Sequence, residues 1–433
     1  MKISKIVLTL IAAGMGAGLV PAAHAADVDR LTQLEQQLKA LQQEIQAMKA
    51  ASAKEISDIR DQATAQVKES VVGGDIPNSF RMPNSETSVR VYGYAEADLI
   101  HDIKGTPSAD FFTNLPGQPL NKDNAKSGKT VLTGETSRFG FETSTPTSVG
   151  PIHTQLEGDF YSYGNAQGSN SVLRLRQAYG EYAGWLIGQT WSTFMDGDNG
   201  PETVDFNGPI GMPFARVGQI RYTYAMASGA TFKIALEDGS HANVSSAVGA
   251  SRPTLVLSAA KSADWGNVNL RLLSHEQRTA SASKTGSGWG IGGQYKISSD
   301  FILMGQYAEV DADNNNPNAM LGANFPVVDA NGGIQMDRSR GGVIGLTKVY
   351  DEKLRTTLAY GFVESVASDA YVAATGDNTL INKRMNQWHL NFIYTPIKNV
   401  DLGAELIGGS RENYAGDKGD LSRINLMARY TFN

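Results

Sequence analysis

Residues 89–99 read Val89-Arg-Val-Tyr-Gly-Tyr-Ala-Glu-Ala-Asp-Leu99, and this stretch decides the fold class. Its odd-numbered positions are apolar or small, whereas its even-numbered positions carry Arg, Tyr, Glu and Asp. Side chains of a β-strand alternate between the two faces of a sheet, so a period of two predicts a strand with one apolar and one polar face. The same alternation recurs along the chain as far as residues 423–432.

The alternating pattern predicts sixteen strands, most of them about 10 to 12 residues long, which is enough for a tilted strand to cross a bilayer. They begin near residues 89, 136, 151, 171, 184, 217, 229, 253, 265, 286, 300, 338, 352, 385, 398 and 420. Two strands break the pattern. Gln177 and Glu181 fall on the same parity as Leu173 and Leu175, and Ile302 and Met304 compete with Phe301 and Leu303 for the apolar face. A β-bulge or a subunit contact is expected there.

The connections between these strands alternate in length. Tight turns such as 182–185 and 227–230 alternate with longer segments rich in Gly, Asn, Asp and Ser, among them 277–285 and 410–419. Outer-membrane barrels place short turns in the periplasm and long loops outside, whereas a soluble sandwich has no reason to sort its loops in this way. We therefore predict an all-β transmembrane fold, a 16-stranded antiparallel up-and-down β-barrel over residues 89–433.

The chain before the barrel differs in composition. Residues 1–25 are typical of an export signal peptide, with two lysines, an apolar stretch and the small-x-small site Ala23-His-Ala25. Residues 26–70 predict a helix whose apolar residues recur at spacings of three and four, as in a coiled coil, although a lone amphipathic helix packed on a neighbour would share this pattern. Residues 71–88 are expected to be a linker. An even strand number puts both barrel ends, and thus the coiled coil, on the periplasmic side.

The composition excludes several classes of protein. Without cysteine, the chain has no thiolate metal site, iron–sulfur cluster or cysteine nucleophile. Residues 1–25 carry only two charges, both lysines, so the remaining chain has 36 of the 38 basic residues and all 44 acidic ones, which argues against nucleic-acid binding. After the signal no apolar run of eighteen residues remains that would predict a transmembrane helix. The six histidines show no ligand spacing, so we expect no enzyme activity, metal or other cofactor.

Several stretches resemble a known family. They are Val91-Tyr-Gly-Tyr-Ala95, Ser137-Arg-Phe-Gly-Phe141, Leu173-Arg-Leu-Arg-Gln-Ala-Tyr-Gly-Glu-Tyr182, Leu186-Ile-Gly-Gln-Thr-Trp-Ser-Thr-Phe194 and Ala428-Arg-Tyr-Thr-Phe432. In this order they resemble the DcaP-like outer-membrane porins of Gram-negative bacteria. The resemblance implies a homotrimer of sixteen-stranded barrels whose N-terminal segments associate as a coiled coil. It also implies a channel that passes small anions and especially dicarboxylates. Asn433 departs from it, since such barrels usually end on the aromatic residue.

The polar faces of the strands identify candidate channel residues, because a barrel of sixteen strands is too wide for side chains to fill. A cationic wall concentrates anions, and the arginine fork binds carboxylates bidentately. The candidate pore-lining and anion-binding residues are Arg90, Arg138, Arg174, Arg176, Arg221 and Arg271. The alternative is that these arginines only neutralise the acids Glu142, Glu157 and Asp159 of neighbouring strands.

Residues 193–213 form an acidic connection that contains three prolines. Its acids are Asp196, Asp198, Glu202 and Asp205. By resemblance to trimeric porins, this segment is expected to fold into the barrel as a constriction loop. Acids opposite an arginine wall would then set up a transverse field, whereas an external loop would expose them to water.

We expect an outer-membrane diffusion channel for small hydrophilic, preferentially anionic solutes such as dicarboxylates. Its expected partners are these solutes, outer-membrane lipid and further copies of the chain. Two alternatives stay open: a general non-selective porin, and a structural tether or adhesin in which the barrel only anchors the coiled coil.

Overall fold

A computed structural model of the chain describes residues 26–68, 72–105, 113–121, 128–161, 172–239, 248–311, 320 and 322–432. The segment expected to be a signal peptide, residues 1–25, lies outside the described residues. The chain divides into two compact units, Met1–Ser70 and Val71–Asn433, and each is described by itself.

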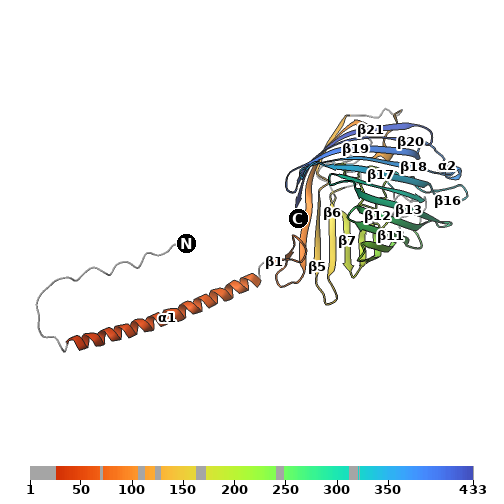
Figure 1. Cartoon of the computed structure of the whole chain (residues 1–433). Helices are drawn as coiled ribbons and strands as arrows, with labels where there is room; N and C mark the ends of the chain where they lie inside the picture. The colour runs from red at the N-terminus through yellow and green to blue at the C-terminus, as the bar shows by residue number, and fades with distance from the viewer. Residues whose placement is uncertain are drawn as a thin grey trace. The chain divides into compact units, whose positions relative to one another are not determined.

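The first unit contains one long helix, α1 (Ala26–Lys68), where the sequence predicts it (Figure 1). The absence of Gly and Pro and the abundance of Ala, Gln, Glu and Lys favour an uninterrupted helix. Leu38, Leu41 and Met48 of the expected seam are 62%, 60% and 58% exposed, so the single chain leaves this apolar seam uncovered. No helix among the described residues is long and apolar enough to cross a membrane.

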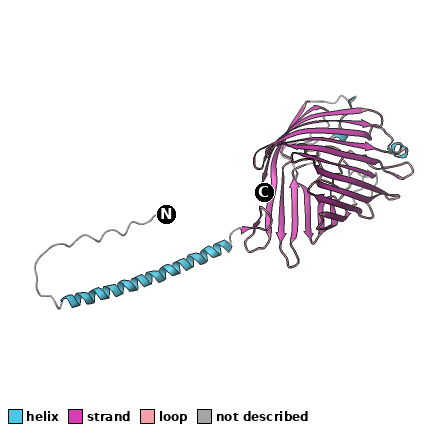
Figure 2. Cartoon of the chain, viewed as in Figure 1, coloured by secondary structure: helices cyan, strands magenta, loops and turns pink. Residues whose placement is uncertain are grey.

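The second unit is a closed antiparallel β-barrel of sixteen strands (Figure 2). The strands are β3 (Ser88–Lys104), β4 (Lys129–Thr133), β5 (Arg138–Thr145), β6 (Ile152–Asp159), β7 (Arg174–Tyr182), β8 (Trp185–Trp191), β9 (Arg216–Ala225), β10 (Ala230–Glu237), β11 (Thr254–Ala263), β12 (Gly266–Arg278), β13 (Ser283–Lys296), β14 (Phe301–Asp311), β17 (Arg338–Val349), β18 (Leu354–Ser365), β19 (Asn382–Ile397), β20 (Val400–Asn413) and β21 (Lys418–Phe432). Each pairs with the next; β4 and β5 both pair with β3 and form one interrupted strand. β21 pairs with β3 and closes the barrel.

The outer face of the barrel is apolar. One row of directly opposed residues crosses six neighbouring strands, and it consists of Leu303, Leu346, Leu358, Leu390, Leu406 and Ile424. Leu358 and Leu406 are 53% and 46% exposed in the isolated chain, although they lie at the middle of long strands. Alternate positions, such as Val343 and Ala359, are buried on the inner side. The exposed leucine row is therefore suited to contact lipid.

Two connections are shorter than the sequence predicts. β12 continues to Arg278 and β13 starts at Ser283, so only 279–282 connect them instead of 277–285. Between β20 and β21 only 414–417 remain, instead of 410–419. The ends of these strands are polar on both faces, which hides the alternation, but their backbones stay paired.

Of the two strands predicted to be irregular, β14 pairs with both neighbours without a register shift, whereas β7 contains a β-bulge. Glu157 pairs with Gln177 while the next residue, Gly158, pairs with Leu175, so Arg176 is the additional residue. Gln189 of β8 donates its Nε2 to the backbone oxygens of Leu175 and Arg176, at 3.3 and 3.4 Å. A side chain thus satisfies carbonyls near the bulge.

The segment expected to be a linker, residues 71–88, is ordered from Val72 onward. β1 (Val72–Gly73) pairs with β2 (Phe80–Arg81), which pairs in turn with the start of β3. Asp75 N donates to the buried Ser88 Oγ at 2.8 Å. Gly74 is required here, because a Cβ at this position would lie 2.2 Å from Ser79 Oγ.

The end of the barrel opposite the tight turns carries additional elements: η1 (Leu115–Gly117), β15 (Val327–Val328), β16 (Ile334–Gln335) and α2 (Asp369–Thr375). Asp337 is fully buried among them and accepts hydrogen bonds from Asn324 Nδ2, Ser339 Oγ and Ser365 Oγ at 2.8, 3.1 and 2.7 Å. Burial outweighs these bonds and raises the pKa of Asp337 to about 6.

Candidate functional site: the constriction loop and the arginine cluster

The connection between β8 and β9, residues 192–215, lies against the inner wall of the barrel. Arg271 of β12 donates Nη1 to the backbone oxygen of Phe194 at 2.8 Å. Ile210 N donates to Gln387 Oε1 of β19 at 3.1 Å. These contacts are incompatible with an external loop, and we call residues 192–215 the constriction loop.

Glu405 of β20 is a buried attachment of the constriction loop. Its two carboxylate oxygens accept hydrogen bonds from the backbone N–H groups of Val204 and Asp205 at 2.9 and 2.8 Å. Oε1 also lies 3.1 Å from His389 Nδ1, and both side chains are inaccessible to solvent. Alternation places Glu405 on the inner face, but its backbone partners are two hundred residues away along the chain, so the sequence does not reveal them.

Two of the predicted loop acids do not face the lumen. Asp196 is buried and accepts hydrogen bonds from Asn199 and from Asn269 Nδ2, the latter at 2.6 Å. Asp205 is buried and accepts the backbone N–H of Thr113 at 2.8 Å. Neither acid is exposed to water, as the external-loop alternative would require. A free carboxylate costs several kcal/mol to bury, and these two are bound to donors that hold the loop.

The other two loop acids remain accessible. Asp198 is exposed. Glu202 is 40% exposed at its side chain and pairs with Arg355 of β18. Of the four predicted loop acids, Asp198 and Glu202 are therefore the two with solvent-accessible side chains.

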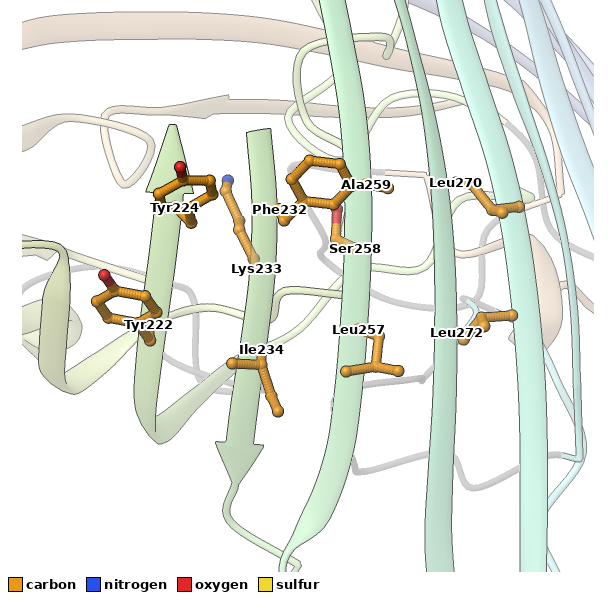
Figure 3. Close-up of a pocket in the computed structure, with 10 residues that line it drawn as sticks. All are labelled: Tyr222, Tyr224, Phe232, Lys233, Ile234, Leu257, Ser258, Ala259, Leu270 and Leu272. Atoms are coloured by element: carbon orange, nitrogen blue, oxygen red, sulfur yellow. The ribbon is translucent and has the colours of Figure 1, made fainter. Parts of the chain in front are cut away.

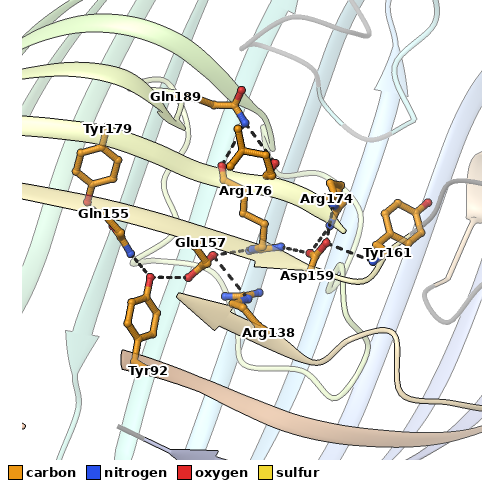
Figure 4. Close-up of polar contacts among 11 residues, drawn as sticks. Tyr92, Arg138, Gln155, Glu157, Asp159, Tyr161, Arg174, Arg176, Tyr179 and Gln189 are labelled. Atoms are coloured by element: carbon orange, nitrogen blue, oxygen red, sulfur yellow. Dashed lines mark hydrogen bonds and ion pairs between the residues drawn. The ribbon is translucent and has the colours of Figure 1, made fainter. Parts of the chain in front are cut away.

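Three of the six predicted arginines meet on one side of the barrel (Figure 4). Arg174 donates Nε and Nη2 to the two oxygens of Asp159 at 2.9 and 2.6 Å. Arg176, the additional residue of the bulge, donates to Glu157 and to Asp159, both at 2.7 Å. Arg138 Nε lies 3.7 Å from Glu157 Oε1. Arg138 and Arg174 keep side-chain exposures of 24% and 30%, whereas Arg176 keeps only 4%.

Arg216 joins this group, although the strand pattern does not identify it. It is the first residue of β9 and is close enough to Arg138, Arg174 and Arg176 for mutual repulsion. It forms no ion pair with any residue that the structure describes, and its buried Nη1 has no hydrogen-bond partner there. Its parity in β9 is that of the exposed Gly218 and Ile220, so strand alternation does not assign it to the lumen. We call Arg138, Arg174, Arg176 and Arg216 the arginine cluster.

Aromatic rings hold the arginine cluster in place. The Arg174 guanidinium carbon lies 4.4 Å from the ring centre of Tyr161, and that of Arg216 lies 4.6 Å from Trp191. Such cation–π contacts stabilise a guanidinium without neutralising it. Phe206 of the constriction loop lies 5.9 Å from Arg176, so the loop reaches the cluster.

The remaining predicted arginines lie elsewhere. Arg90 pairs with Glu142 at 2.6 Å, and Arg221 lies 3.7 Å from Glu181. Arg271 is 1% exposed, 3.9 Å from Asp196, beneath the constriction loop. The structure thus contradicts the pore-lining position of Arg271, because the loop covers it.

The ion pairs of the cluster agree with the alternative that these arginines neutralise acids of neighbouring strands. The positive groups nevertheless outnumber the negative ones. Glu157 and Asp159 are its two carboxylates, opposite the four guanidinium groups of Arg138, Arg174, Arg176 and Arg216. Two positive charges are therefore in excess. The cluster adjoins the constriction loop through the contact of Arg176 with Phe206, and partial burial strengthens the field of a charge relative to bulk water.

A separate groove of about 400 Å³ lies over β9 to β12 (Figure 3). Most of its lining is apolar and outward-facing, with Tyr222, Phe232, Ile234, Leu257 and Leu270. These side chains share the parity of the lipid-facing surface, so this groove belongs to the membrane contact and not to the channel.

A closed antiparallel barrel with an apolar exterior and a charged, loop-narrowed interior defines an outer-membrane porin. The chain matches the family model of the DcaP outer membrane protein over residues 21–432. It belongs to the DcaP outer membrane protein family, a class of channels, and resides in the outer membrane of a Gram-negative bacterium.

Solved structures agree with this assignment. The outer membrane channel DcaP of Acinetobacter baumannii is 30% identical, with 80% of this chain and 97% of that chain covered and a TM-score of 0.72. An anion-selective porin from Comamonas acidovorans is 14% identical, with 80% and 100% covered and a TM-score of 0.53. A trimer form of OmpT of Vibrio cholerae is also 14% identical, with 80% and 99% covered and a TM-score of 0.51. The last two show the shared fold alone. No curated protein matches the chain.

Proposed function

We propose that this porin is a passive diffusion channel for small hydrophilic solutes, with a preference for anions such as dicarboxylates. The observation that carries the proposal is the excess of two positive charges in the arginine cluster beside the constriction loop. Fixed cations at a narrow point raise the local concentration of anions and lower that of cations. Transport of this kind involves no chemical step.

Two partly exposed guanidinium groups favour carboxylates in particular. Arg138 and Arg174 keep side-chain exposures of 24% and 30% although each also pairs with an acid. A guanidinium binds a carboxylate through two parallel N–H···O bonds, and such charge-assisted bonds are stronger than neutral ones. A dicarboxylate can engage the cluster with one end while its other end remains solvated.

The test is the reversal potential of the purified channel in a planar bilayer under a salt gradient. We expect the sign that marks anion preference, and addition of a dicarboxylate should reduce the chloride current as it occupies the cluster. A cation-favouring sign would refute the anion preference. Absence of conducting pores would instead support the tether or adhesin function.

A general non-selective porin is the second candidate, and one observation favours it. Arg138, Arg174 and Arg176 all have carboxylate partners, so much of their charge is compensated. Liposome swelling distinguishes the two candidates. A non-selective porin admits a neutral sugar and a dicarboxylate of similar size at similar rates, whereas the proposed channel admits the dicarboxylate faster.

We also propose that the protein is a homotrimer, joined through the barrel wall and through α1 as a coiled coil in the periplasm, after removal of residues 1–25. The support from the barrel is the length of β5 to β8, which have 8, 8, 9 and 7 residues. Most of them fall short of the ~9–11 residues that a lipid-crossing strand needs. Their outer face includes the hydrogen-bonded pair Thr143 and Thr154 and the half-buried Gln189 side chain. Another copy is a better neighbour for this face than lipid. Light scattering in detergent should give three chains per particle.

A further inference from the structure

The outer face of the barrel carries a row of alternating charges at the end opposite the tight turns. Its members are Glu309, Arg340, Glu364, Arg384, Glu412 and Lys418, and each lies directly opposite the next in the strand register. Each lies six residues along its strand from a member of the leucine row, so both rows share the outward parity. Six residues of a strand span about 20 Å. The charged row therefore marks the external edge of the apolar band.

A groove of about 500 Å³ lies directly below this row, on the outer face of β19, β20, β21 and β3. Its lining includes Asn386, Trp388, Ser410, Asp420, Ser422 and Lys104. Gly408 forms its floor: a Cβ at this position would lie 2.4 Å from the indole Nε1 of Trp388. The absence of a side chain lets the ring lie over the strand. Asn386 Nδ2 donates to Ser410 Oγ at 3.0 Å. We call this concave surface the rim groove.

The cations around the rim groove extend further into solvent than the acids beside them. Arg384, Lys418 and Lys104 have side-chain exposures of 61%, 66% and 67%. Their partners Glu364, Glu412 and Asp420 have exposures of 22%, 29% and 42%. The pairing distances are 2.8, 3.7 and 3.6 Å, so both lysines are only loosely held. A group that approaches from the lipid side meets ammonium and guanidinium donors first.

We propose that the rim groove binds the phosphorylated sugar headgroup of an outer-leaflet glycolipid. Lys and Arg are the usual partners of a phosphate, and basic pockets at the membrane surface bind lipid phosphates. Asn386, Ser410 and Ser422 offer hydrogen bonds to sugar hydroxyls, and Trp388 is a residue type that favours the headgroup level. The leucine row below the groove provides the surface for the acyl chains. This site is independent of the channel lumen.

Native mass spectrometry of the full-length protein in detergent, titrated with bisphosphorylated lipid A, tests the proposal. Lys104→Ala/Arg384→Ala/Lys418→Ala should raise the half-saturating lipid concentration by tenfold or more. The matched control, Lys261→Ala/Lys353→Ala/Lys398→Ala, removes three exposed lysines from the tight-turn end and should bind as the native protein does. Equal loss in both triple variants, or no loss in either, would overturn the proposal.

Three further titrations identify the chemistry. Lipid A without its phosphates and a zwitterionic phosphatidylcholine should bind at least tenfold more weakly than bisphosphorylated lipid A. Inorganic phosphate at equal concentration should not compete, because it lacks the sugar and the acyl chains. If it does compete, the groove is a free-phosphate site and the lipid proposal is wrong. Ser410→Trp changes no charge and fills the groove, so it should also abolish lipid binding. This variant tests the proposal independently if the triple variant does not fold.

Discussion

Arg355 of β18 donates Nε and Nη2 to the two carboxylate oxygens of Glu202, both at 2.8 Å, and thereby joins the barrel wall to the constriction loop. The two residues are 153 positions apart in the sequence. Arg355 also lies 3.5 Å from Asp401, so one guanidinium serves two acids. The pair is partly exposed to the lumen, where water and salt weaken it.

Arg355→Ala should therefore loosen the loop without unfolding the barrel. Exposed pairs contribute about 0–1 kcal/mol, so the melting temperature should change little. The released loop segment should fluctuate into and out of the path of the permeating ions. Single-channel recordings should therefore show increased open-channel noise. Arg340→Ala is the control, because it breaks an ion pair on the outer face, in which Nε and Nη2 both donate to Glu364 Oε2, and it should leave the noise unchanged.

Glu405→Gln should have a larger effect. The native carboxylate accepts two backbone N–H groups of the loop, and hydrogen bonds to a charged group contribute about 1.5–3 kcal/mol each. A neutral amide accepts them more weakly and presents donors to Val204 and Asp205 in one orientation. We expect a higher mean conductance and a lower melting temperature. Unchanged conductance would show that Glu405 does not hold the loop.

Gly361→Val should displace the loop by steric contact alone. A Cβ at residue 361 would lie 2.0 Å from the carbonyl oxygen of Ile210, which is backbone and cannot rotate away. The loop has to move, and conductance should rise with no change of charge. Gly218→Val is the control, since nothing lies within 4 Å of a Cβ at that position. Equal conductance in both variants would contradict the observed packing.

Arg216→Ala should reduce the anion preference. One unit charge about 7 Å away in water contributes about 0.6 kcal/mol, which is roughly a threefold change in the permeability ratio. Arg216→Lys retains the charge and should restore most of the ratio, although it cannot bind a carboxylate with two parallel bonds. The measurement is the reversal potential in a salt gradient. If Arg216→Ala leaves it unchanged, the excess charge of the cluster does not control selectivity.

The external elements should respond to pH through Asp337. Its pKa is raised from 3.8 to about 6, so protonation favours the folded arrangement. This contribution, about 3 kcal/mol for a shift of that size, is fully present below about pH 4 and is lost as the pH rises through 6. Hydrogen-exchange protection factors of α2 should therefore be higher at pH 5 than at pH 7.5. Asp337→Asn should remove this difference, and a variant with the native pH dependence would assign it to another group.

The sequence predicts most of the barrel because alternation is a local property. Sixteen strands, their closure and the β7 bulge follow from parity within short windows, as Gln177 and Leu175 show. The inward positions of Arg138 and Arg174 follow for the same reason. The ends of β12 and β20 carry polar residues on both faces, so the apolar and polar positions no longer alternate there. The lengths of these two strands were therefore not predictable.

The interior of the channel is less predictable, because its contacts join residues far apart in the chain. Glu405 meets Val204, and Thr113 meets Asp205, through the path of the constriction loop. The alternation of side chains along β12 predicts that Arg271 points inward. It does not predict that the constriction loop covers this residue. Arg216 shares the parity of the exposed Gly218 and Ile220, so alternation does not place it with the other arginines of the cluster.

The doubled-back segment of β1 and β2 determines how a mechanical force on the N-terminal side reaches the barrel. A pull on Val72 acts first on the two residue pairs between β1 and β2, and then on the two pairs between β2 and β3. These short ladders can part and reform while β3 keeps its long pairing with β21 and β5. A tension applied at Val72 therefore meets four residue pairs before it reaches the pairing of β3 with β21 that closes the barrel.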